Sequence, residues 1–122
     1  MASETDAVPG AQALELTPTA VAQLLESEPA TLLVDVREAH ERTQAHIAGS
    51  THIPLGELSG RSAELPSETR LIFYCQVGVR SLLAAEAFRA SGYDAYTMGG
   101  GIVRWAREGL PVAPDGATPL PD

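Results

Sequence analysis

The residues best suited to covalent chemistry lie in one short stretch, CQVGVRS at residues 75–81, which contains the only cysteine of the 122-residue chain. A thiolate is a strong nucleophile, and the charges and N–H groups around the sulfur decide how much of it is present. Gly78 permits a tight turn, and Arg80 adds a positive charge if its side chain turns toward the sulfur. These residue types predict a reactive thiol in a loop that also binds an anion.

The segments on either side of this loop indicate how the cysteine is positioned. Residues 71–74 are apolar or aromatic without alternation, which is typical of a strand buried on both faces of a parallel sheet. A helical pattern begins at Ser81 and runs to residue 91, and Gly92 offers a left-handed stop. Cys75 is therefore expected where a central strand meets a helix, which is the end of the sheet where ligands bind.

Such a junction favours the thiolate form of Cys75. A tight loop directs backbone N–H groups inward, and the first N–H groups of a helix have no partner within the helix, so partial positive charge gathers near the sulfur. Surroundings of this kind lower the pKa of a cysteine from ~8.5 to roughly 3.5–7.5. The alternative is that Cys75 is a small apolar core residue, as an arbitrary lone cysteine usually is.

A second buried strand is expected over residues 31–36, where Asp35 interrupts an apolar run. A buried carboxylate is costly without a partner, so Asp35 should be hydrogen-bonded or ion-paired. Arg37 follows at the end of the strand and is a candidate for that partner. The alternative for Arg37 is an exposed ion pair, which contributes only ~0–1 kcal/mol.

Two further groups of residues invite a ligand-binding interpretation. Gly99 to Gly101 are consecutive glycines before a helix at 102–107, so the backbone must bend sharply or approach another segment closely. The Lys-Ser/Thr of a phosphate-binding P-loop is missing there. His40, His46 and His52 recur every six residues, but no pair stands at i, i+4 and no second cysteine is available, which argues against a metal site.

The remaining segments complete an alternation of strands and helices. They are a short edge strand at 13–16, a helix from Pro18 to about Ser27 capped by Thr17, a short polar helix at 38–44 and a last strand at 95–98. Residues 55–68 are expected to be a loop with one turn of helix. This order predicts an α/β fold with a mostly parallel central sheet, right-handed crossovers and helices on both faces.

Composition and charge limit the class of protein and its partners. A chain with 44% apolar and 20% charged residues is typical of one soluble domain, and it contains no apolar run long enough for a membrane span. The net charge of −8 argues against nucleic acid and anionic membrane surfaces as partners. The first residues lack the features of a secretory signal, and a lone cysteine fits a reducing, cytoplasmic compartment. We expect a flexible arm at 1–12, one domain at 13–110 and an irregular tail at 111–122.

Three separated motifs resemble those of the rhodanese family. CQVGVRS resembles its active-site loop, DVRE at residues 35–38 resembles the element that braces the active site, and MGGGIVRW at residues 98–105 resembles its G-G-x-x-x-W signature. HIAGSTHIP at residues 46–54 is similar to a fourth family element, with Ser50 where alanine is usual. The resemblance covers roughly residues 13–110 and implies a rhodanese-like fold with a central, mostly parallel sheet.

The activity that this resemblance implies is sulfur transfer by a single-domain sulfurtransferase. The Cys75 thiolate would take the outer (sulfane) sulfur of thiosulfate or a persulfide and pass it to cyanide, a thiol or a protein cysteine. No metal or organic cofactor is implied. The loop residues expected to bind the substrate are Gln76, Val77, Gly78, Val79 and Arg80, and the residues expected to support the site are Asp35, Arg37 and Ser81.

Two alternatives remain beside this interpretation. The related dual-specificity phosphatases have five residues between cysteine and arginine, whereas four separate Cys75 from Arg80, so the narrower loop argues against phosphatase or arsenate reductase activity. A non-catalytic sulfur-relay or redox-sensing module that docks a partner protein is the second alternative. Gln76 also replaces a cation found in efficient thiosulfate users, and Val77 and Val79 are apolar, so we expect weak turnover with thiosulfate.

Overall fold

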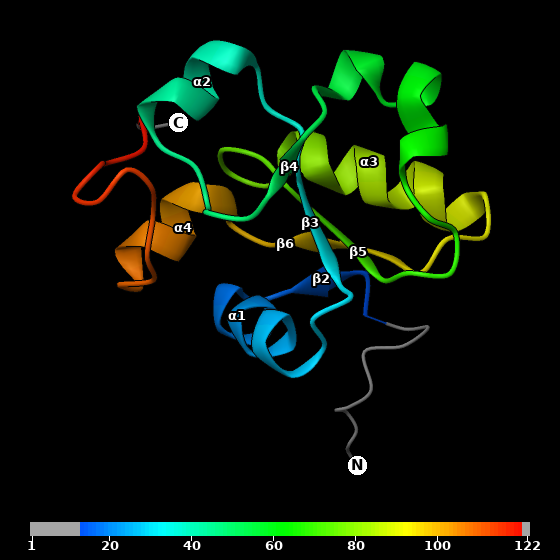
Figure 1. Ribbon diagram of the computed structural model, residues 1–122, viewed down its shortest axis with the longest axis horizontal. Helices are drawn as coiled ribbons and strands as arrows, with labels where there is room; N and C mark the ends of the chain where they lie inside the picture. The colour runs from blue at the N-terminus through cyan, green and yellow to red at the C-terminus, as the bar shows by residue number, and fades with distance from the viewer. Residues whose placement is uncertain (1–12, 121–122) are drawn as a thin grey trace.

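The structure is a computed structural model that describes residues 13–120 of the chain. Five parallel strands form its central sheet, in the order β2-β6-β5-β3-β4 (Figure 1). The strands are β2 (Glu15–Leu16), β3 (Leu32–Asp35), β4 (Thr51–His52), β5 (Leu71–Tyr74) and β6 (Ala95–Met98). The flexible arm predicted for residues 1–12 lies outside the described residues.

Helices cover both faces of this sheet, as the sequence predicts. In the part of the chain that the structure describes, the α-helices are α1 (Pro18–Ser27), α2 (Ala39–Gln44), α3 (Val79–Ala90) and α4 (Gly101–Arg107). Two short 3₁₀ helices, Leu55–Glu57 and Ser59–Glu64, occupy the segment expected to be mostly loop. α3 and these turns pack on one face, and α1 and α4 pack on the other (Figure 1). The predicted rhodanese-like α/β architecture is therefore confirmed.

The central strand β5 is buried on both sides, which explains its unbroken apolar sequence. Leu71 and Phe73 belong to the core shared with α3, whereas Ile72 and Tyr74 belong to the core shared with α1 and α4. All four side chains are fully buried. Successive residues of a strand point to opposite faces, so β5 ties the two cores together and holds the residue that follows it, Cys75, in place.

The structure corrects two details of the sequence prediction. β4 was not predicted, because it is only two residues long, contains no apolar residue, and pairs with β3 through Val34 opposite Thr51 and Asp35 opposite His52. α3 begins at Val79 rather than Ser81, because Gly78 adopts a φ of 105° and starts the helix directly after itself. Arg80 and Ser81 therefore lie in the first turn of α3.

Residues 111–120 of the C-terminal tail form no helix or strand, yet they fold back along the domain. Ala113 exchanges two backbone hydrogen bonds with His46, at 2.9 and 2.7 Å. Trp105 is buried under the sheet and donates its indole N–H to the carbonyl of Pro111 at 2.8 Å. Figure 1 shows the described part of the tail, in red, passing α4 and running toward α2. The tail thereby reaches the edge of the sheet where Cys75 lies.

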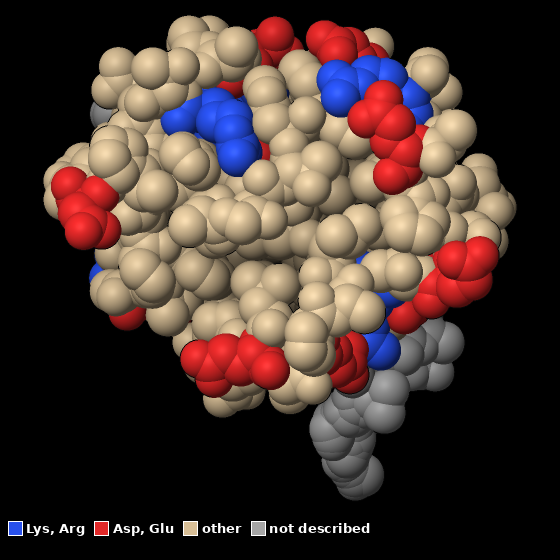
Figure 2. Space-filling model, viewed as in Figure 1, with Lys and Arg blue, Asp and Glu red and all other residues tan. Residues whose placement is uncertain are grey.

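Charged side chains on the face seen in Figure 1 lie mainly toward its margin (Figure 2). Among the described residues visible there, acidic groups are spread over several places and the arginines form no continuous basic patch. Nucleic acid binding relies on such a patch. Within residues 13–120, no helix has both the length and the apolar character needed to cross a membrane.

Candidate active site

Cys75 directly follows β5 at the carboxyl edge of the sheet, where the sequence placed it. Its side chain is buried, with 1% of the residue exposed. The sulfur accepts hydrogen bonds from the backbone N–H groups of Gly78 at 3.1 Å and Ser81 at 3.4 Å. N–H groups directed at a sulfur stabilise negative charge on it. The environment of Cys75 is therefore polar on the side of the loop and the first turn of α3, unlike that of a plain core residue.

The hydroxyl of Ser81 adds a third polar contact to the sulfur. Ser81 Oγ lies 3.4 Å from Cys75 Sγ, and it accepts a 2.7 Å hydrogen bond from Thr97 Oγ1. Cys75 Sγ is the donor of the first bond, so Ser81 Oγ accepts from both the thiol and Thr97. Ser81 and Thr97 are both completely buried, so this chain of hydroxyls is fixed by the fold.

The glycine run and the first residues of α4 pack against the backbone of Cys75 and Gln76. Gly101 has a φ of 62°, and a Cβ at this position would lie 2.3 Å from the carbonyl oxygen of Gln76 and 2.6 Å from that of Cys75. Ile102 N–H donates to the Cys75 carbonyl at 2.9 Å, and Val103 N–H donates to the Gln76 carbonyl at 3.2 Å. A trans peptide points its N–H opposite to its C=O, so these bonds turn the following loop N–H groups away from α4. The predicted bend and close approach are both confirmed.

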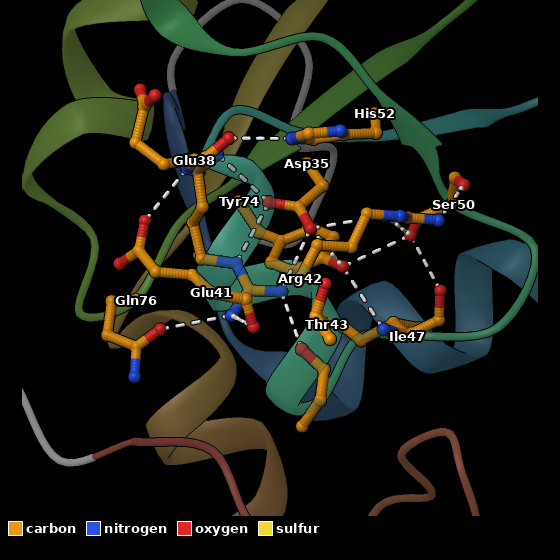
Figure 3. A network of polar contacts seen from close by, with 12 residues as sticks. Asp35, Glu38, Glu41, Arg42, Thr43, Ile47, Ser50, His52, Tyr74 and Gln76 are labelled. Atoms are coloured by element: carbon orange, nitrogen blue, oxygen red, sulfur yellow. Dashed lines mark hydrogen bonds and ion pairs between the residues drawn. The ribbon is translucent and has the colours of Figure 1, made fainter.

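Asp35 is buried and paired, as predicted from its apolar flanks. It accepts two hydrogen bonds of 2.9 Å from the Arg37 guanidinium, one of 3.1 Å from Arg42 and one of 3.2 Å from the Tyr74 hydroxyl. Figure 3 shows Arg42 and Tyr74 beside this carboxylate. Burial alone would raise the pKa of Asp35, but the hydrogen bonds and charges of Arg37 and Arg42 outweigh it and hold this pKa below its ordinary value.

Arg37 joins this buried carboxylate to the Cys75 loop. Its side chain is 1% exposed, so the alternative of an exposed ion pair is wrong. It donates to the carbonyl of Ala45 at 2.7 Å and to Gln76 Oε1 at 3.0 Å. Gln76 in turn donates through Nε2 to the carbonyl of Leu120 in the tail. The oxygen and the nitrogen of the Gln76 side chain are thus both hydrogen-bonded within the protein. Substrate binding by Gln76 stays a prediction, and it would use the backbone N–H of this residue.

Arg80 forms a two-pronged ion pair with Glu41 of α2. Its guanidinium donates to the two carboxylate oxygens at 2.8 and 2.7 Å. These hydrogen bonds are the largest cause that lowers the pKa of Glu41 to about 2. Glu41 also accepts the backbone N–H of Glu38 at 2.8 Å, as part of the cap of α2. The positive charge expected near Cys75 is present, but it has a carboxylate partner.

Of the other residues expected to bind substrate, one contacts the sulfur and two are exposed to solvent. Gly78 contacts Sγ through its N–H, whereas Val77 and Val79 are 40% and 66% exposed. His52 lies 2.7 Å through Nε2 from the Arg37 carbonyl (Figure 3). Within residues 13–120, no group of three or more His, Cys, Asp or Glu side chains is arranged to hold a metal ion.

Sequence reasoning missed Thr97 and Glu41, for different reasons. Thr97 carried a usable signal, because it is a polar residue inside the otherwise apolar strand AYTM, and it is completely buried. Glu41 carried none, because one carboxylate in a polar helix looks like any other until its partner, 39 residues away, is placed beside it.

Fold and site together define an α/β domain with a cysteine cradled by amides at the carboxyl end of its central strand. Comparison with known families gives the specific assignment: the rhodanese-like domain matches residues 17–108, and the chain belongs to this family. A sulfurtransferase of Allochromatium vinosum is 35% identical over 104 residues, which cover 84% of this chain and 97% of that protein. The resemblance noted in the sequence is confirmed, and sulfur transfer is the general chemistry that it supports.

Two further relatives place the domain in context. The probable adenylyltransferase/sulfurtransferase MoeZ of Mycobacterium tuberculosis is 37% identical over 109 residues, which cover 87% of this chain but only 28% of that longer protein. The crystal structure of a rhodanese-related protein from Thermoplasma volcanium superposes with a TM-score of 0.73 at 32% identity, covering 81% of this chain and 96% of that one. The domain therefore occurs both nearly alone and as part of a larger protein.

Proposed function

We propose that this chain is a rhodanese-type sulfurtransferase whose nucleophile is Cys75. The observation that carries the proposal is the pair of backbone N–H groups, from Gly78 and Ser81, directed at the sulfur of the only cysteine. The Cys75 thiolate attacks the outer sulfur of the donor, and the donor's S–S bond breaks with its electron pair on the leaving group. Thiosulfate releases sulfite, a persulfide releases a thiolate, and Cys75 becomes a persulfide.

The second step returns the enzyme to its starting state. The acceptor, which is cyanide, a thiol or a protein cysteine, attacks the outer sulfur of the Cys75 persulfide. The bond between Sγ and that sulfur breaks, and its electron pair returns to Sγ as the thiolate. The N–H groups of Gly78 and Ser81 stabilise this charge without having to reorganise, since the fold holds them in place beforehand.

The charges around the loop favour a persulfide over thiosulfate as the donor. Thiosulfate carries two negative charges, yet Arg80 is paired with Glu41 and Gln76 is uncharged. The side chains of Val77 and Val79 are apolar and exposed, and the chain carries a net charge of −8. Only the backbone N–H dipoles of the loop then attract the thiosulfate dianion. A persulfide, which carries less charge, therefore binds better than thiosulfate.

A comparison of donors tests this function. With 2-mercaptoethanol as acceptor, kcat/KM should be higher for cysteine persulfide than for thiosulfate, and Cys75→Ser should be inactive with both. Sulfur transfer that survives in Cys75→Ser would exclude the proposed nucleophile. A clear preference for thiosulfate would leave the nucleophile in place but exclude the proposed donor.

A sulfur-relay or redox-sensing module that docks a partner protein is the second candidate. Two observations favour it: Cys75 is 1% exposed, and a relative that contains this domain, MoeZ, is much longer than the domain itself. Negligible turnover of the isolated chain, together with stoichiometric persulfide formation on Cys75, would favour the relay. In either role a lone reactive thiol suits a reducing compartment, and we propose the cytoplasm.

A further inference from the structure

Exposed large apolar side chains are few within residues 13–120, and most of them lie close together along the chain. They are Val77, Val79, Leu82, Leu83 and Leu120, with exposures from 36% for Leu82 to 66% for Val79. Four of them lie within eight residues of Cys75, and Leu120 is bonded through its carbonyl to Gln76, the residue after Cys75. We call these five residues the apolar rim.

The helical geometry of α3 places three rim residues on one face. Val79, Leu82 and Leu83 stand at i, i+3 and i+4, and the opposite face packs Ala84, Ala85 and Phe88 into the core. The outward face changes character farther along the helix, where Glu86, Ala87 and Ala90 are exposed. Large apolar residues therefore occupy only the end of the exposed face that adjoins Cys75. Packing within the domain does not fully explain them, because more than a third of each residue is exposed.

An exposed apolar cluster beside a reactive sulfur suits a partner that delivers or collects sulfur. Cyanide or a small thiol needs no apolar surface to reach Cys75. A protein segment does, because it must hold its own cysteine against a sulfur that is only 1% exposed. Arg80, which follows Val79 in the chain, is paired with Glu41, so these two charges compete little for such a partner.

Resting on the sulfurtransferase function, we propose that the apolar rim docks an acceptor protein. The docked segment carries its acceptor cysteine between apolar residues and has no acidic residue beside it, because a chain of net charge −8 repels acidic partners. Five side chains form a contact far smaller than a permanent interface, so the complex is short-lived, as repeated sulfur transfer requires. The sulfur transferred is the outer atom of the Cys75 persulfide, and the docked thiolate replaces Sγ as its bonding partner.

Two synthetic peptides with blocked ends provide the probes: Leu-Val-Cys-Gly-Leu and the polar Ser-Thr-Cys-Gly-Ser. Cys75 is first loaded with polysulfide and desalted, and its transfer of sulfur to each peptide and to 2-mercaptoethanol is followed by mass spectrometry. The apolar peptide should react at least about tenfold faster than the polar one, because it buries apolar surface on the rim.

The variant Leu82→Gln/Leu83→Gln should remove this preference. The matched control, Ala87→Gln/Ala90→Gln, adds two amides to the same helix face farther from Cys75 and should keep the preference. Loading of Cys75 and transfer to 2-mercaptoethanol should stay within about twofold of wild type in both variants, because neither replaces a residue that contacts the sulfur.

The outcomes separate this proposal from the proposed function. A wild-type chain that cannot be loaded with sulfur overturns both. A chain that loads normally but reacts equally with the two peptides, or a Leu82→Gln/Leu83→Gln variant that keeps the preference, overturns only the docking role. A wild-type dimer that becomes a monomer in this variant would assign the rim to self-association and also overturn it.

Discussion

Two arginines reach the surroundings of the Cys75 loop, and they are held in different ways. Arg37 has a side chain 1% exposed and bonds to Asp35, Ala45 and Gln76. Arg80 has a side chain 33% exposed and bonds to Glu41 alone among the described residues. Arg37 is surrounded by acceptors on several elements, whereas a single carboxylate holds Arg80. Several bonds therefore fix the first arginine, whereas the charge of the second depends on one partner.

Replacing Arg37 should have the largest effect. Arg37→Met keeps an apolar stem but leaves the buried Asp35 with less compensation, so the free energy of unfolding at pH 7 should fall by about 3–5 kcal/mol. Urea denaturation measures this loss. The control, Arg104→Met, breaks an exposed pair with Glu108 and should cost at most about 1 kcal/mol. Equal losses in the two variants would remove the distinction between the buried and the exposed arginines.

Replacing Glu41 should release the charge of Arg80 at a smaller cost. In Glu41→Gln the guanidinium loses its carboxylate partner, so kcat/KM for thiosulfate should rise by about three- to tenfold. The free energy of unfolding should fall by about 1 kcal/mol, since the pair is partly solvated. The control, Glu57→Gln, breaks the exposed pair with Arg61 and changes the net charge equally, and it should leave thiosulfate turnover unchanged. An unchanged or lower value in Glu41→Gln would mean that Arg80 does not act on the donor.

The pH dependence of stability provides a finer test of the Arg80 pair. The pKa of Glu41 is lowered from 4.5 to about 2, mainly by hydrogen bonds from Arg80. A carboxyl with a lowered folded pKa stabilises the protein fully above its unfolded pKa, and this stabilisation is lost as the pH falls toward the folded pKa. Wild type should therefore lose more stability than Glu41→Gln as the pH falls from 4.5 toward 2. The lowered pKa of Asp35 also makes stability depend on pH, but it does so in both chains and cancels in the difference between them.

Urea midpoints measured for both chains from about pH 3 to pH 6 provide the comparison. Parallel profiles would show that Arg80 does not hold Glu41 in its charged form.

The contrast between the arginines also shows what the sequence could predict. The uninterrupted apolar residues of β5, the buried carboxylate of Asp35 and the glycine run at the start of α4 each follow from local chemistry, and the structure confirms them. The bond between Arg37 and Gln76 and that between Gln76 and the tail depend on segments 39 and 44 residues apart. No local sequence pattern indicates such pairings, so the positions of these side chains could be determined only from the three-dimensional structure.

The sequence also did not predict the short strand β4 or the first residue of α3. β4 is two residues long and contains no apolar residue, so its pairing with β3 decides its structure. The first turn of α3 begins two residues early because of the positive φ of Gly78, and this shift brings the Ser81 N–H to the sulfur. The same glycine that was expected to bend the loop thus also sets the start of the helix.

The central claim is that Cys75 accepts a sulfur atom within its cradle of N–H groups. Intact mass spectrometry after treatment with polysulfide or a persulfide tests it directly, with Cys75→Ser beside the wild type. We predict a gain of ~32 Da, one sulfur atom, that cyanide removes and that the serine variant does not show. An unchanged wild-type mass, or the same gain in Cys75→Ser, would contradict the claim.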